Sequence, residues 1–211
     1  MTLRAISNAG RRINVSKIPS QKMNEQIWSE SILERDCALT LECDHNVIRY
    51  VGQGARVYYE LDGKRRIYTA DFLVNRKTGR PQIIEVKLRR FITPWFEQLF
   101  RIITPICDNA GYDFLVLTEL EIRIEPFLSN IKRQLYYSRT PIHPQHYLLC
   151  DEFFRTNGQS TLGQIVDFFD ARTCDRSVVF ALMHRGVIST DHSVPLTMNS
   201  LIQPGSRPNQ E

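Results

Sequence analysis

The sequence predicts an α/β domain, built as a mixed sheet flanked by helices, followed by a mainly helical domain. Three observations support this prediction. Short apolar runs bounded by Gly, Pro and Asp-Gly pairs occur in the first half of the chain and indicate strands. Stretches with helical periodicity flank these runs on both sides. Beyond residue 120 the strand pattern ends and four helical stretches follow.

The bulk composition is that of an ordinary soluble protein. A chain of 211 residues holds one large domain or two small ones, and an apolar content of 42% is enough for a buried core. The net charge of +4 is small, but the lysines and arginines occur in clusters. Clustered cations suit a polyanion such as DNA. Such clusters are more often only a solvated face, so this support is weak.

Several common site types and locations are disfavoured by the sequence. The five cysteines are scattered and include no C-x-x-C pair, which argues against structural zinc and disulfides. His143 and His146 lie next to prolines, where metal-ligand geometry would be poor. No apolar run is long enough to span a membrane, and the N-terminus lacks a signal-peptide core. We therefore expect a cytoplasmic protein with no membrane partner.

The predicted elements divide the chain into an arm and two domains. Residues 1–22 carry basic and small polar residues with little periodicity and are expected to form the arm. The first domain is expected at residues 23–120 and the second at residues 121–211. The first contains a helix at 24–42, strands at 47–51 and 56–61, an Asp62-Gly63 turn, a helix at 95–107 that starts after Thr93-Pro94, and a strand at 113–118.

The centre of the first domain is a pair of strands at residues 68–74 and 82–88. Alternate side chains of a strand share a face, so Asp71 is expected to lie with Ile67, Thr69 and Leu73, and Glu85 with Lys87. Charges on a buried face are costly unless they are paired or metal-bound. Two interpretations follow: a structural ion pair with a spare acid, or a metal site.

The helix expected at residues 24–42 adds two further carboxylates. Glu30 and Glu34 both fall within its apolar stripe. One interpretation is that both side chains reach sideways to water. The functional interpretation is that one of them approaches the metal site from the helix.

The pattern D-x(13)-E-x-K formed by Asp71, Glu85 and Lys87 resembles the PD-(D/E)xK motif of restriction-endonuclease-like nucleases. Ala70 stands where that family often has proline. The predicted order of helix, strands, helix and strand is the core that this motif normally occupies. The resemblance implies a restriction-endonuclease-like fold for residues 23–120.

A longer set of segments resembles the TnsA family, the endonuclease subunits of heteromeric transposases. These segments are SILERD, YTADFLVN, IIEVK and DFLVLTE, followed by a winged-helix-like end. The resemblance implies that Glu34, with Glu30 as the alternative, contributes from the helix. It implies Mg²⁺, replaceable by Mn²⁺, as the cofactor. The implied metal ligands are Glu34, Asp71, Glu85 and the carbonyl of Val86; the implied catalytic residues are Glu34, Asp71, Glu85 and Lys87.

The same resemblance implies a bacterial protein that cuts DNA at the 5′ ends of a transposon. A TnsB-like recombinase would cut and join the 3′ ends, and a TnsC-like AAA+ ATPase would bind the C-terminal domain. Two alternatives remain open. One is a restriction or junction-resolving nuclease of the same fold that acts alone. The other is a non-catalytic adaptor for DNA or protein, against which the presence of all four site residues argues.

The second domain is expected to be winged-helix-like. Helices are predicted at residues 126–137, 144–155, 161–169 and 175–185, with a strand-like tail at 195–202. The last helix carries mostly apolar side chains and few of the polar ones that read DNA bases. This composition favours docking to a protein.

Overall fold

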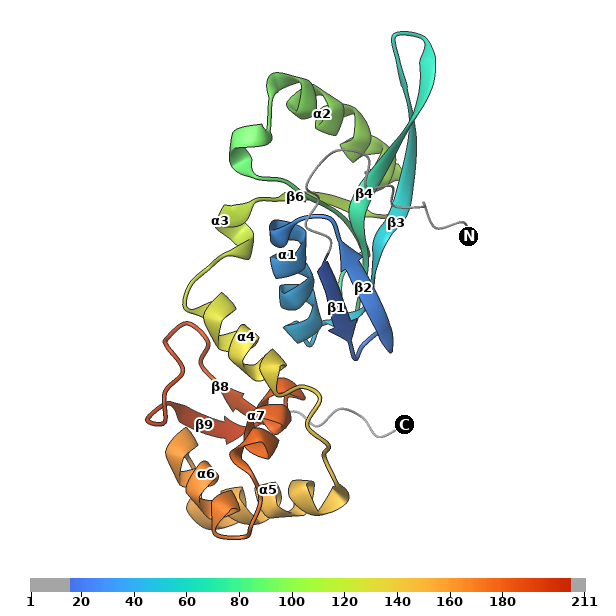
Figure 1. Cartoon of the computed structure of the whole chain (residues 1–211). Helices are drawn as coiled ribbons and strands as arrows, with labels where there is room; N and C mark the ends of the chain where they lie inside the picture. Colours follow the sequence, from blue (N-terminus) through green and yellow to red (C-terminus); the bar gives the residue numbers. More distant parts are fainter. Residues whose placement is uncertain (1–15, 206–211) are drawn as a thin grey trace. The chain divides into compact units, whose positions relative to one another are not determined.

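The structure of the protein is a computed structural model that describes residues 16–205 (Figure 1). The chain divides into two compact units, Met1–Ile122 and Arg123–Glu211. The division falls close to the boundary expected after residue 120. Residues 1–15 of the expected arm lie outside the described part of the chain.

The first unit contains a four-stranded mixed sheet in the order β3-β4-β5-β6. Neighbouring strands are antiparallel from β3 to β5, whereas β5 and β6 run parallel. A parallel pair needs a long crossover, and α2 supplies it. The strands are β3 (Val47–Leu61), β4 (Lys64–Arg76), β5 (Gln82–Val86) and β6 (Asp113–Leu117), and the helix is α2 (Pro94–Asn109).

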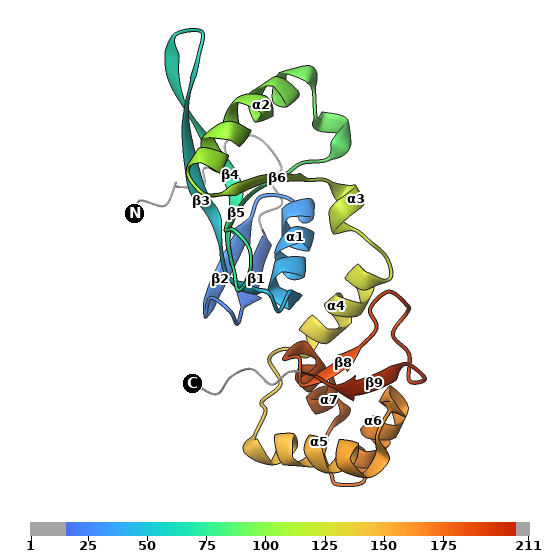
Figure 2. The same cartoon turned by 180° about the vertical axis from the view of Figure 1, so that it is seen from behind.

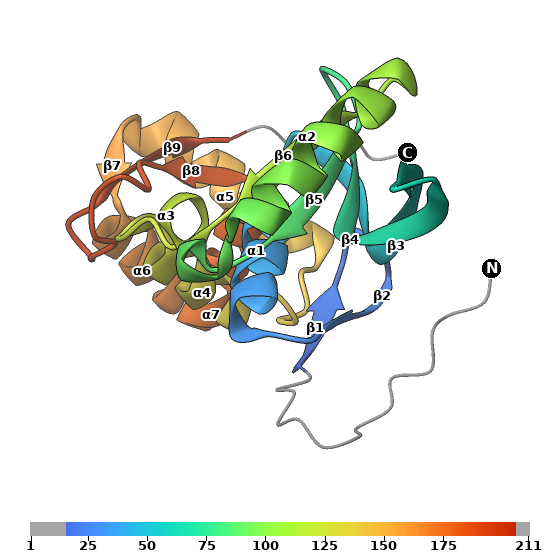
Figure 3. The same ribbon diagram turned by 90° about the horizontal axis from the view of Figure 1, so that it is seen from above.

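Helices cover both faces of this sheet. Side chains of α1 (Ile32–Cys43) pack in one core cluster with Ile84, and side chains of α2 pack in another with Ile83. Adjacent strand residues point to opposite faces, so the two helices lie on opposite sides, as Figures 1 and 2 show. Seen from above, α2 runs along β6 (Figure 3). A mixed sheet flanked by helices fits a restriction-endonuclease-like core.

The start of the first unit differs from the expected arm and long helix. Glu25–Ser29 form strand β2, which pairs antiparallel with β1 (Ser16–Ser20). The helix begins only at Ile32, because the Ser31 side chain caps it by accepting a hydrogen bond from the Glu34 amide at 3.0 Å. Absence of Gly and Pro was therefore an insufficient signal for a helix over residues 24–31.

Lys22 ties the β1–β2 hairpin to the end of α1. Its ammonium donates hydrogen bonds to the carbonyls of Leu41 and Val47, each at 2.9 Å, and to that of Asp44. The carbonyls of Leu41 and Asp44 lie at the C-terminal end of the helix, where a positive charge is favourable, and that of Val47 lies at the start of β3. Burial lowers the pKa of Lys22, against the opposing influence of nearby acids.

Glu42 adds a second link at the same place. Its side chain is buried and accepts a hydrogen bond from the Ser20 hydroxyl at 2.7 Å and another from the Tyr50 hydroxyl at 2.9 Å. A buried carboxylate is stable only when its oxygens are paired in this way. Glu42 is therefore accounted for by the fold.

Strands β3 and β4 form one long hairpin instead of the shorter strands expected at 47–51 and 56–61. The register shifts between Gly52 and Ala55, so the chain continues through a bulge without ending the strand. The predicted turn is confirmed: Asp62 and Gly63 have φ values of 54° and 66°, as a type I′ turn requires. The end of this hairpin projects past α2 (Figure 1).

The second unit holds the four predicted helices and a small sheet. The strand-like tail expected at 195–202 is confirmed only at Leu201 and Ile202, because Thr197 and Ser200 form a turn through the 3.0 Å bond from the Ser200 amide to the Thr197 carbonyl. The sheet order is β7-β9-β8. The elements are α4 (Phe127–Tyr136), α5 (Pro144–Asn157), β7 (Ser160–Thr161), α6 (Leu162–Asp170), α7 (Arg176–His184), β8 (Ile188–Thr190) and β9 (Leu201–Pro204).

Helix α7 is the core of this unit. Every residue from Val178 to His184 is buried, so its apolar side chains pack inside the unit and are not free to dock another protein. In the part of the chain that the structure describes, no helix combines the length and apolar character needed to span a bilayer.

Candidate functional site

The predicted site lies where β4 and β5 separate. The antiparallel pairing of these strands ends at Phe72 and Ile84. One residue beyond, Asp71 Oδ2 accepts a hydrogen bond from the Val86 backbone amide at 2.7 Å. A side-chain carboxylate thus occupies the place of a strand-to-strand bond. The arrangement holds Asp71 in the gap between the two strands.

The direction of β4 side chains changes at this same residue. Ala70 packs in the core cluster with α2, whereas Phe72, two residues further on, packs in the cluster with α1. Strict alternation would place both on one face. The β3 register shift lies opposite Asp71, and it explains the change. Leu73 also packs in the cluster with α2, so the expectation that it shares a face with Ile67 and Thr69 is wrong.

Glu85 and Lys87 form an ion pair. Glu85 is 6% exposed, and its Oε1 lies 3.1 Å from Lys87 Nζ. The same ammonium lies 4.0 Å from the centroid of the Phe96 ring, which comes from α2. The structure thus contains the ion pair that the structural interpretation of the sequence expected, and Asp71 is the acid outside this pair.

Glu34 approaches this place from the first turn of α1. Burial raises the pKa of Glu34, and the charges of Glu30 and Glu85 raise it further. Its Oε2 also accepts a hydrogen bond from the Glu30 backbone amide at 2.8 Å, so Glu34 has a structural role as well. The Glu30 side chain instead accepts a hydrogen bond from Gln53 at 2.7 Å. Of the two helix-side candidates, Glu34 is the one that interacts with the strand carboxylates.

The electrostatic centre of the site is Asp71. Burial, followed by the negative charges of Glu85 and Glu34, raises the pKa of Asp71 to about 8. The Val86 amide and Lys87 act in the opposite direction. Three acids from α1, β4 and β5 therefore influence one another, and a single ammonium offsets them incompletely.

The oxygen donors fit a hard divalent cation, but they are not gathered around one point. Among residues 16–205, no three His, Cys, Asp or Glu side chains form a set that could hold a metal ion as they stand. Each acid has another partner: Lys87 for Glu85, the Val86 amide for Asp71 and the Glu30 amide for Glu34. Carboxylates are the ligands Mg²⁺ and Mn²⁺ prefer. The pKa of Asp71 is raised by burial and then by nearby negative charge, and a cation would offset that charge. Metal binding requires these side chains to exchange partners.

Tyr68 is a neighbour of the site that the sequence pattern did not identify. Its hydroxyl is buried and has no hydrogen-bond partner among the described residues. Burial and the nearby Glu85 carboxylate raise the pKa of Tyr68. Simple alternation puts Tyr68 and Asp71 on opposite faces, and only the change of direction within β4 brings both near Glu85.

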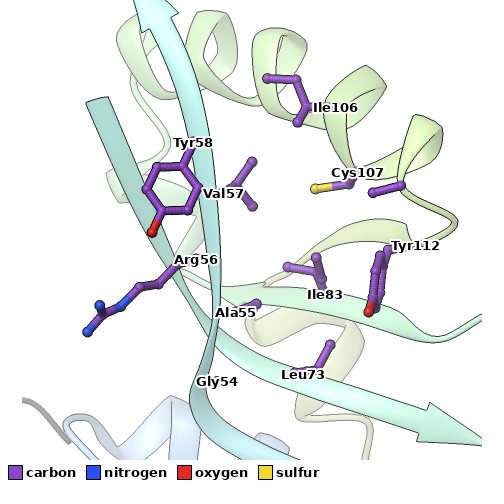
Figure 4. Close-up of a pocket in the computed structure, with 11 residues that line it drawn as sticks. Gly54, Ala55, Arg56, Val57, Tyr58, Leu73, Ile83, Ile106, Cys107 and Tyr112 are labelled. Atoms are coloured by element: carbon purple, nitrogen blue, oxygen red, sulfur yellow. The ribbon is translucent and has the colours of Figure 1, made fainter. Parts of the chain in front are cut away.

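A cavity of about 420 Å³ lies elsewhere, between β3 and the last turns of α2 (Figure 4). Its walls are mainly apolar side chains such as Val57, Ile83 and Ile106. None of the predicted site residues lines it. The cavity is therefore not the place where the carboxylates act.

Comparison with known families identifies the segment that carries these strands. Residues 44–119 match the family model described as TnsA-like endonuclease N terminal. The match supports a TnsA-like nuclease of the PD-(D/E)xK type and confirms the resemblance predicted from the motifs. It includes Asp71, Glu85 and Lys87, whereas Glu34 precedes it. No curated protein matches the chain.

Proposed function

We propose that this chain, whose residues 44–119 match the TnsA-like endonuclease N-terminal family, is a metal-dependent endonuclease that cuts DNA at the 5′ ends of a transposon. The observation that carries the proposal is the electrostatic interaction of three acids from three elements beside one lysine. Asp71 and Glu85 come from neighbouring strands and Glu34 from α1, and the charges of all three interact. Lys87 is the cation of the group.

The chemistry of DNA cleavage explains why such a group is suitable. Hydrolysis of a phosphodiester needs a nucleophilic water and a way to neutralise charge that develops on the phosphate. Glu34, Asp71, Glu85 and the Val86 carbonyl would hold Mg²⁺ or Mn²⁺. Such an ion, when bound, activates water and offsets phosphate charge.

Lys87 supplies a positive charge at the site that does not depend on a metal ion. Its ammonium, within hydrogen-bond reach of Glu85, is suited to orient the attacking water and to offset phosphate charge. The Phe96 ring beside it restricts where the ammonium lies. We infer that Lys87 orients water and stabilises charge, and that a role as general base is secondary.

We propose that the second unit is winged-helix-like and binds partners. Support comes from its order of two helices, a strand, two helices and two strands, with the strands in one sheet. Because α7 is buried, a docking surface for a TnsC-like ATPase must use other side chains. The second unit exposes large apolar side chains at Tyr136, Leu148, Val194, Met198 and Leu201. The 3′ ends would be processed by a TnsB-like recombinase.

The Glu85–Lys87 pair favours one alternative function. A buried ion pair of this kind is also what a non-catalytic adaptor of this fold would retain. The two functions differ in metal binding: the nuclease must bind Mg²⁺ or Mn²⁺ at Asp71 and Glu85, whereas the adaptor need not. A nuclease of the same fold that acts alone would cut DNA as the purified chain, without a recombinase.

The proposal is tested by strand-specific mapping of cuts at transposon ends in the presence of the recombinase subunit. Asp71→Ala and Glu85→Ala should each abolish 5′ cleavage while 3′ joining continues. Asp108→Ala is the matched control, because this carboxylate is exposed and forms an ion pair with Arg80, which is not a predicted site residue. Continued 5′ cleavage by both site variants would refute the assignment.

A further inference from the structure

Within residues 16–205, nothing packs against one face of the outer part of the β3–β4 hairpin. Val57 and Tyr59 on β3 are buried in the cluster with α2. The residues between and beside them, Arg56, Tyr58 and Glu60, point to the other face and are exposed. Figure 4 shows Arg56 and Tyr58 directed away from α2. Among the described residues, the hairpin packs through one face only, and we call the other its free face.

Apolar side chains occupy the middle of the free face. Tyr58 pairs directly with Ile67 across the two strands, and these side chains are 67% and 58% exposed. Leaving two large apolar groups side by side in water forgoes the gain from burying them. Grouped exposed apolar residues on a monomer commonly mark a binding surface.

Cations surround this apolar pair. Arg56 and Arg65 lie on the same free face as Tyr58 and Ile67, one on either side of the pair. Lys64 and Arg66 extend the charge around the tip, where only Glu60 and Asp62 are acidic. All four cations are exposed, and within residues 16–205 none of them forms an ion pair. The free face therefore presents cations that are available to an anionic partner.

We propose that residues 56–67 form an arm that lies in a groove of duplex DNA. Two properties favour DNA as the occupant. A two-stranded ribbon fits the major groove, which is about 12 Å wide. The mixture of unpaired cations and apolar side chains also matches its chemistry, because arginine and lysine bind the phosphates that flank a groove, while apolar groups contact thymine methyls. The inference rests on the proposed function and identifies a surface through which that nuclease would bind its DNA substrate.

The arm is tested by measuring the affinity of the full-length chain for duplex DNA over a range of salt concentrations. Arg56→Gln with Arg65→Gln should weaken binding about tenfold and make the salt dependence shallower, since each lost phosphate contact lowers the slope by about one. Tyr58→Ser with Ile67→Ser should weaken binding and leave the slope unchanged. The matched control is Lys77→Gln with Arg101→Gln, which removes two exposed cations of the same unit and should change affinity less than twofold.

The outcomes test DNA binding by residues 56–67 separately from the proposed nuclease function. DNA binding by residues 56–67 is contradicted by any of three results: the hairpin variants bind as the wild type does, the control variant loses as much affinity as they do, or the wild type does not bind duplex DNA. It is also overturned if the hairpin variants lose a protein partner while retaining DNA, which would assign this face to that protein. Metal-dependent cleavage by the wild type is scored separately. If the wild type does not cut DNA but the hairpin variants bind DNA more weakly than it does, DNA binding by residues 56–67 is supported and the nuclease function is contradicted.

Discussion

Lys87 Nζ lies 3.1 Å from Glu85 Oε1, so the lysine forms an ion pair with a carboxylate that is expected to bind a metal ion. A buried carboxylate without a cation beside it is unfavourable, so the lysine stabilises the fold in the state described. The same contact makes Lys87 a competitor of the metal for Glu85. The role of Lys87 in structure and its role in chemistry are therefore separable by experiment.

The first prediction concerns this competition. Lys87→Met should bind Mn²⁺ several-fold more tightly than the wild type, because Glu85 loses its competing cation. Cleavage should nevertheless fall about 100-fold, a loss typical of removing one group that stabilises developing charge. The rise in melting temperature on adding Mn²⁺ reports the affinity. Lys77→Met, at an exposed lysine, serves as the control. Weaker Mn²⁺ binding by the Lys87 variant would contradict the competition.

The second prediction concerns pH. Since the pKa of Asp71 is raised from 3.8 to about 8 in the folded chain, the folded state binds this proton more tightly than the unfolded state. The contribution to stability is fully present below pH 4 and is lost as the pH rises toward 8. Asp71→Asn removes this loss. The melting temperature of the variant, relative to the wild type in metal-free buffer, should increase across this range and then level off.

The control for the pH prediction is Asp108→Asn, an exposed aspartate that has Arg80 as its partner. Its melting temperature relative to the wild type should not rise between pH 4 and 8. An advantage of the Asp71 variant that shrinks as the pH rises would show that the carboxyl is not held in its protonated form.

The third prediction concerns the aromatic ring beside Lys87. Phe96→Leu keeps an apolar side chain but removes the ring that the ammonium faces at 4.0 Å. Such contacts contribute about 0.5–2 kcal/mol, so the cleavage rate should fall several-fold while the affinity for DNA is retained. Phe168→Leu is the matched control, because it removes a ring that the Arg172 guanidinium faces at 3.5 Å in the second unit. If both variants cut equally well, the ring does not position Lys87.

The fourth prediction concerns the anchor at the end of α1. Lys22→Met removes a cation that donates hydrogen bonds to three backbone carbonyls. Hydrogen bonds to charged groups contribute about 1.5–3 kcal/mol each and leave partners unsatisfied when lost. We expect the free energy of unfolding to fall by about 1–3 kcal/mol in chemical denaturation. Lys77→Met should change it by less than about 0.5 kcal/mol, as is usual for exposed sites.

Local signals in the sequence determined much of the first unit. The Asp62-Gly63 turn joins neighbouring strands, and a hairpin of neighbours needs no knowledge of distant residues. The strands that bear Asp71 and Glu85 were identified for the same reason. In the second unit the helix starts at Thr161 and Asp175 were marked by capping side chains, which bond to their own chain two or three residues on.

Non-local contacts decided what the sequence alone did not. Glu25–Ser29 are a strand because Ser16–Ser20 pair with them, and nothing within the segment itself announces that partner. The change of side-chain direction beside Asp71 depends on a register shift in β3, a different strand. The sequence alone thus predicted that Asp71, Glu85 and Lys87 lie near one another, because their spacing on adjacent strands is local. Only the tertiary structure decided which charges pair, because a buried carboxylate takes its partner from whatever the fold brings within hydrogen-bond reach.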